Sequence, residues 1–109
     1  MRVEEAVGRQ IARLREARRM SLAELGEAVG RYLGRPWSRQ AVHQAERGRR
    51  SFTATELTAL ALALDTSIPA LLVADSGEEP IELPGRAVSP EEYRAVLLHA
   101  DKDIPWGVL

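Results

Sequence analysis

The sequence predicts an all-α protein in which five helices form one domain and an additional helix follows at the C-terminal side. Apolar residues recur every three to four positions through most of the chain, which is the period of a half-buried helix. All but the first of the periodic segments are preceded by serine or threonine, the preferred N-cap residues. A chain of 109 residues with 45% apolar content can bury one core of ordinary size.

The first two helices are amphipathic. Residues 3–18 carry a helical apolar stripe, made of Val3, Val7, Ile11, Leu14 and Ala17. The stretch Ser21-Leu22-Ala23-Glu24 is a capping box, in which serine and glutamate satisfy orphan N–H groups at a helix start. The helix that begins there keeps its period through Gly30, with an apolar set of Leu22, Leu25, Ala28, Val29, Tyr32 and Leu33. Gly34 followed by Pro36 predicts its end.

Three further helices complete the domain, and the first and last of them are short. Ser38 caps a helix that runs to about Arg47, with Gly48 as its stop. A second capping box at residues 53–56 opens a helix from Ala54 to Leu64, which is apolar almost all round and is expected to be mostly buried. Ser67 caps the fifth helix, residues 68–73.

The C-terminal third has a different composition. Residues 74–88 read as an acidic linker with prolines and glycines, in which Ile81-Glu82-Leu83 forms a short extended piece. Ser89-Pro90-Glu91-Glu92 signals a sixth helix to about Ala100. The division we expect is a domain at 1–73, the linker at 74–88, and a C-terminal helix and tail at 89–109.

Apolar residues of this third need a surface to cover them. The helix stripe consists of Tyr93, Val96, Leu97 and Ala100, and the tail adds Ile104, Trp106, Val108 and Leu109. So small a segment cannot bury this area by itself. It packs on its own domain, on a second copy as a dimerisation arm, or on another partner.

Composition excludes several function classes. The absence of cysteine excludes disulfides and thiolate metal sites, and the two histidines are too few for a structural zinc site. We find no Ser-His-Asp or Cys-His set and no phosphate-cradling glycine loop, so we expect no enzyme, no metal and no cofactor. No apolar run is long enough for a membrane span and no signal peptide is recognisable, which predicts a cytoplasmic protein without a membrane partner.

Charge is divided unevenly along the chain, although the net charge is only −1. Residues 1–51 hold twelve arginines and six glutamates, net +6, whereas residues 52–109 are net −7. An anionic partner would therefore bind the first half. Fourteen of the fifteen basic residues are arginine, which suits phosphate and guanine, although a genome rich in G and C gives the same bias.

Three stretches in order, "MSLAELGEAVG", "SRQAVHQAERGRR" and "ATELTALALALDTSIPALL", resemble the Xre family of helix-turn-helix regulators, the phage Cro and C1-repressor type. The resemblance covers about residues 3–73. In that family the third helix follows a pattern of serine, an aliphatic residue, and Glu-x-Gly, filled here by Ser38, Val42, Glu46 and Gly48. The resemblance implies a Cro/repressor-like fold and a bacterial, nucleoid-associated transcriptional regulator that binds double-stranded DNA in a sequence-specific manner, with a homodimer as the expected form.

Groove geometry then assigns roles to side chains. A recognition helix presents its N-terminal turns to the base edges, so the expected base contacts are Arg39, Gln40, Gln44 and His43, with His43 on the flank. The expected phosphate contacts are Ser21, Ser38, Arg47, Arg49 and Arg50. Capping alone is the alternative for the two serines, and an ordinary exposed surface is the alternative for the base-contact residues. Glu46 is expected to hold nearby backbone or an arginine, as in the resembled family.

One departure from the family lies between the second and third helices. Gly30 to Ser38 is eight positions instead of the usual three, so about five residues within "RYLGRP" are extra. We expect the second helix to gain a turn, with Trp37 packing against it. The alternative is a protruding loop that reaches phosphate through Arg31 and Arg35.

Two other functions remain open at this point. The chain could be a protein-interaction module, such as an antitoxin or adaptor, that holds a protein partner with its acidic C-terminal tail. RNA binding is disfavoured, because among five aromatic residues only Trp37 lies within the basic stretch.

Overall fold

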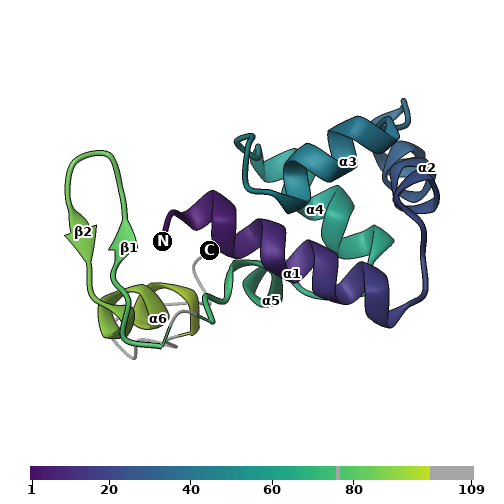
Figure 1. The fold of residues 1–109 in the computed structure, drawn as a ribbon. Helices are drawn as coiled ribbons and strands as arrows, with labels where there is room; N and C mark the ends of the chain where they lie inside the picture. The colour runs from purple at the N-terminus through teal and green to yellow at the C-terminus, as the bar shows by residue number, and fades with distance from the viewer. Residues whose placement is uncertain (76, 99–109) are drawn as a thin grey trace, which may run out of the picture.

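The structure is a computed structural model that describes residues 1–75 and 77–98. Its elements are α1 (Val3–Ala17), α2 (Leu22–Leu33), α3 (Arg39–Glu46), α4 (Ala54–Ala63), α5 (Ile68–Leu72), β1 (Ile81–Glu82), β2 (Ala87–Val88) and α6 (Pro90–Leu98). In Figure 1, α2 and α3 lie on one side of the long α1, whereas the small hairpin and α6 lie at its N-terminal end. The all-α fold class with its additional helix is confirmed.

The predicted caps set the helix boundaries. At α2 the Ser21 hydroxyl accepts the Glu24 N–H at 3.0 Å, and the Glu24 carboxylate accepts the Ser21 N–H at 2.8 Å. The same reciprocal pair forms at the start of α4 and of α6. Each box satisfies two orphan N–H groups, which is why the helix starts agree with prediction to the residue.

The main core is formed by all five helices from α1 to α5. Ile11, Leu25, Leu60 and Leu64 are fully buried in it. The expectation that α4 is mostly buried is wrong for one face, because Leu62 is 53% exposed. Helix α4 packs on α2 and α5, and these neighbours leave its remaining side in solvent.

Residues 74–88, expected to be a linker, contain an antiparallel hairpin in which Ile81 pairs with Val88. Ile81 is fully buried against Met1 and Ala6 in a second, smaller cluster. The Glu82 N–H donates to the Met1 carbonyl at 2.8 Å, and the α-amino group of Met1 donates to the Pro80 carbonyl at 3.1 Å. The extended piece at 81–83 is thus confirmed at β1, but it is docked on the N-terminal end of the chain.

Helix α6 covers its predicted apolar stripe only in part. The Tyr93 hydroxyl donates to the Leu72 carbonyl at 2.5 Å, and its ring packs with the smaller cluster. Burial raises the pKa of Tyr93. Val96 is 83% exposed, so the stripe is not buried along its whole length. Ala100 and the tail residues Ile104, Trp106, Val108 and Leu109 lie outside the described residues.

Candidate nucleic-acid interface

Helix α3 lies along one edge of the molecule (Figure 1), and its outer face is polar. Its inner side buries Val42 and Ala45, while its outer side exposes Arg39, Gln40, His43 and Arg47. Positions 39, 43 and 47 are four apart and therefore lie on one line of the helix. Gln44 is half-buried, so it lies at the rim of this face, and His43 lies closer to its centre than the sequence suggested.

The inner side of α3 rests directly on α1. A Cβ atom on Gly8 of α1 would lie 2.5 Å from the Ala45 carbonyl oxygen, so only glycine allows this approach. Next to this contact, the Arg15 guanidinium holds Glu46, with Nε to Oε2 at 2.5 Å and Nη2 to Oε1 at 3.1 Å. The contact with Glu46 raises the pKa of Arg15. The expected structural role of Glu46 is confirmed, and Arg15 is a residue that sequence reasoning did not single out.

The segment after α3 turns sharply at Gly48, whose φ is +67°. The Arg49 N–H donates to the Gln44 carbonyl at 3.0 Å and the Gly48 N–H to the Ala45 carbonyl at 3.1 Å, as in a Schellman motif. The Arg2 guanidinium donates to the Gly48 carbonyl at 2.9 Å. This fixed turn leaves the side chains of Arg47 and Arg49 exposed beyond the end of α3.

Arg50 is placed differently from its neighbours. It is half-buried, its guanidinium donates to Glu56 Oε2 at 2.5 Å, and its Cζ lies 4.3 Å from the centroid of the Trp37 ring. Ion pair and cation–π contact together tie the segment after α3 to α4 and to the turn before α3. Sequence reasoning identified Glu56 as a capping residue and missed this second bond.

The two capping serines stand in different electrostatic surroundings. Ser21 shares the start of α2 with Glu24, whose carboxylate accepts the Ser21 N–H, and this bond lowers the pKa of Glu24. The first turn of α3, capped by Ser38, contains no acidic residue. The start of α3 therefore attracts anions more strongly than the start of α2.

The turn before α3 follows the first of the two expectations. Helix α2 continues through Gly30 to Leu33 and ends at Gly34, whose φ is +86°. The chain then folds back on α2, and the Trp37 N–H donates to the Gly26 carbonyl at 3.2 Å. Tyr32 is 53% exposed, so it follows the helical period without joining the core.

Two carboxylates near α3 are engaged within the protein, whereas many arginines around it are not; a third, Glu27, lines a groove with Ser38 and Arg39. Glu46 binds Arg15 and Glu56 binds Arg50. Within residues 1–75 and 77–98, a group of exposed arginines has no carboxylate within ion-pair distance; around α3 these are Arg31, Arg35, Arg39, Arg47 and Arg49. The internal pairs leave the surface around α3 strongly positive.

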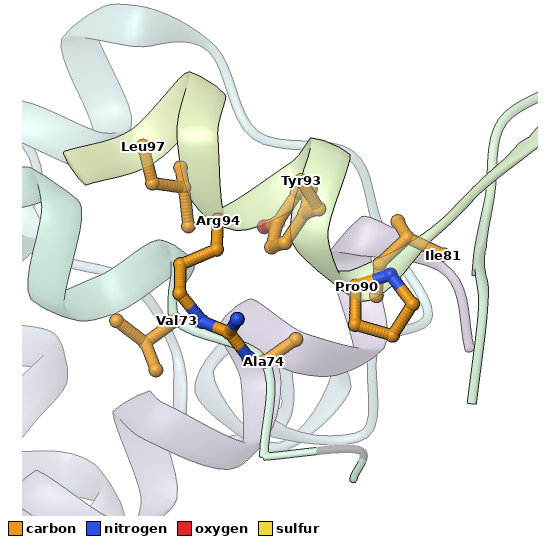
Figure 2. Close-up of a pocket in the computed structure, with 7 residues that line it drawn as sticks. All are labelled: Val73, Ala74, Ile81, Pro90, Tyr93, Arg94 and Leu97. Carbon is orange, nitrogen blue, oxygen red and sulfur yellow. The ribbon is translucent and has the colours of Figure 1, made fainter. Parts of the chain in front are cut away.

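Away from α3, the described part of the chain contains a small pocket. Figure 2 shows a pocket between the end of α5, β1 and α6, lined by Val73, Ala74, Ile81, Pro90, Tyr93, Arg94 and Leu97. Its volume of about 60 Å³ holds a few waters, far below the roughly 300 Å³ of small ligand sites. Among the described residues there is no His, Cys, Asp and Glu group suited to a metal ion, and no helix with the length and apolarity to cross a membrane.

Residues 6–73 match the model of a protein family described as "Helix-turn-helix domain". The chain belongs to this helix-turn-helix family. The match spans α1 to α5 and confirms the resemblance to helix-turn-helix regulators, whose second helix of the motif is the DNA-recognition helix. It supports a DNA-binding regulator of transcription in the all-α class.

Among solved structures, the chain is similar to the restriction-modification controller protein C.AhdI from Aeromonas hydrophila. The two share 28% identity with a TM-score of 0.49, over 62% of this chain and 94% of that one. No curated protein matches the chain.

Proposed function

We propose that this helix-turn-helix protein is a sequence-specific regulator that reads the major groove of double-stranded DNA with α3. The observation that carries the proposal is the charge arrangement around α3: Glu46 and Glu56 are held in internal ion pairs, while the outer arginines are exposed and have no such partner among the described residues. An α-helix fits the major groove of B-DNA, which is about 12 Å wide.

Base reading is assigned to the first turns of α3. Arg39 can donate two hydrogen bonds to guanine O6 and N7, and Gln40 can pair with adenine N6 and N7, each worth about 1–3 kcal/mol of discrimination. His43 lies on the same exposed line and contributes a further base or phosphate contact. Gln44 reads from the rim, with less of its side chain available.

Phosphate contacts flank this reading face. Ser38 lies at the N-terminal end of α3, and its hydroxyl, which accepts the Ala41 N–H, still has its own hydrogen to donate. Arg47 and Arg49 lie at the other end, where they fix affinity and register without reading sequence. Arg50 is bound to Glu56 and stacked on Trp37, so it fixes this segment on the protein instead of contacting DNA. Ser21 is assigned chiefly to capping, because Glu24 places a negative charge beside it.

Association is the second part of the proposal. A homodimer would read two half-sites about 34 Å apart, one helical turn of DNA, and its operator would be a two-fold symmetric sequence. The protein acts on DNA in the nucleoid without metal or cofactor.

In vitro selection from a random duplex library at physiological salt tests the proposal. We expect the wild-type protein to enrich one motif, and the Arg39→Ala, Gln44→Ala double variant to lose it. Arg94→Ala, which removes an exposed arginine on α6 at the other end of the molecule, is the control and should enrich the wild-type motif.

Equal results for wild type and double variant would refute reading by α3. A protein that binds duplexes without enrichment would have only salt-sensitive phosphate binding. In that case a protein partner for the acidic C-terminal tail would become the better hypothesis.

A further inference from the structure

The turn that joins α2 to α3 is long, and it is held rigidly against α2. Gly34 ends the helix in the left-handed region, and its N–H donates to the Gly30 carbonyl at 2.9 Å. A Cβ atom on Gly30 would lie 2.6 Å from Pro36 Cα, and one on Gly26 would lie 2.1 Å from the Trp37 carbonyl oxygen. The backbone of residues 34–37 is therefore packed on the helix it follows, so its exposed side chains occupy a fixed place.

The two extra arginines of this region face different surroundings. Arg31 lines a groove with Glu24 and Glu27 of α2 and Ala63 of α4, so it faces this acidic side of α2, although neither carboxylate forms an ion pair with it. Arg35 is exposed in the turn itself and has no carboxylate within ion-pair distance among the described residues. Within the described part of the chain, Arg35 therefore adds an unpaired positive charge to that of Arg39 at the start of α3, and both side chains are exposed.

Distance along the chain places Arg35 beside the groove that α3 would enter. It is three residues before the Ser38 cap, so its Cα lies within about 10–11 Å of the start of α3. The major groove of B-DNA is about 12 Å wide, so each edge of the groove, where the phosphates begin, lies about 6 Å from a helix centred in it. Figure 1 shows the turn at the end of α3 that adjoins α2, on the same upper edge of the molecule as α3.

From this placement we propose that the lengthened turn is a second DNA contact, in which Arg35 binds a phosphate flanking the groove at the N-terminal end of α3. The inference rests on the proposed function, because it places the phosphate relative to a DNA-bound α3. Phosphate contacts then flank α3 at both ends. Arg35 binds the DNA backbone at the N-terminal end of the helix, and Arg47 and Arg49 bind it at the C-terminal end. Arg31 takes no part in this contact.

Salt dependence of DNA binding tests the contact, with Arg35→Ala compared with the matched variant Arg31→Ala. The logarithm of affinity falls linearly with the logarithm of salt concentration, and each lost phosphate contact makes this negative slope shallower by about 0.9. Between 50 and 200 mM salt, wild type should therefore lose about threefold more affinity than Arg35→Ala. Arg31→Ala should keep the wild-type slope, and Arg35→Lys should keep it too, because a lysine can still bind phosphate as a point charge.

The effect of Arg35→Ala should be the same on a selected operator and on an unrelated duplex, and the selected motif should not change. An unchanged slope for Arg35→Ala overturns the proposal. A changed base preference at one operator position also overturns it, because Arg35 would then read a base. If wild type selects no motif at all, the proposed function fails, but the slope on an unrelated duplex still decides whether Arg35 binds phosphate.

Discussion

At the scale of single residues, the basic face depends on which charges are used inside the protein. Glu46 is an acidic residue within a stretch of arginines, and by position alone it would weaken binding to an anion. Its side chain is 9% exposed and that of Arg15 is 15% exposed, so this ion pair is largely withdrawn from solvent. Arg15 also donates to the Met20 carbonyl at 2.8 Å, which links the end of α1 to the segment before α2. One pair thus anchors α3 and removes a carboxylate from its surface.

Replacing Glu46 with alanine should be strongly destabilising. The substitution leaves the Arg15 guanidinium in a partly buried place with the Met20 carbonyl and the largely exposed Glu16 carboxylate as its remaining partners, and breaking a buried pair in this way costs about 3 kcal/mol. Urea unfolding should show a lower midpoint with an unchanged slope. The matched variant Glu92→Gln removes the charge from the exposed pair with Arg86 and should cost under about 1 kcal/mol. Equal losses in the two variants would contradict this account.

Some of these residues could be predicted from the sequence and others could not, for a physical reason. The capping of α2, α4 and α6 depends on residues three positions apart, which a sequence displays directly. The partner of Glu46 is 31 positions away, and no spacing rule identifies Arg15. The sequence predicts a phosphate contact for Arg50 because this residue follows α3, whereas its place depends on Trp37 and Glu56, which are brought to it by the fold.

At the scale of elements, the ends of α3 are fixed by backbone features. Gly48 has a left-handed φ of +67° and also lies against α1, where an added Cβ would be 2.8 Å from Glu5 Cα. The turn it makes sets the direction of the segment that carries Arg47 and Arg49. Two requirements, a positive φ and absence of a side chain, therefore coincide at one residue.

The variant Gly48→Ala should be destabilised by about 1–3 kcal/mol, because alanine is strained at this φ and its Cβ meets the backbone of α1. Thermal unfolding should show a clear decrease in Tm. Gly85→Ala in the hairpin is the control, since its Cβ would meet nothing within 4 Å and its φ is not positive. A Gly48→Ala protein as stable as Gly85→Ala would show that α3 can end in another way.

At the scale of the whole molecule, two apolar clusters share the N-terminal helix. The larger cluster is formed by the five helices α1 to α5, and the smaller cluster consists of Met1, Ala6 and Ile81. Val3 packs against both clusters. Sequence reasoning missed the smaller cluster because strands of two residues show no period and their partners lie about eighty positions away. The hairpin is thus attached at the same helix end from which Arg2 reaches the turn at Gly48.

This arrangement makes the expected division at residues 73 and 74 testable by Ile81→Ala. Removing this fully buried side chain should lower the free energy of opening of the hairpin by about 2 kcal/mol. Amide exchange in the hairpin should therefore be roughly thirtyfold faster. The Glu82 N–H, which donates to the Met1 carbonyl, reports this opening directly. If the hairpin and α6 form a unit of their own, amides of α3 and α4 should keep their wild-type protection. Leu83→Ala, at a position that is 44% exposed, is the control and should leave both regions unchanged. Loss of protection in α3 and α4 together with the hairpin would show instead that the chain unfolds as one unit, with α1 transmitting the change from one cluster to the other.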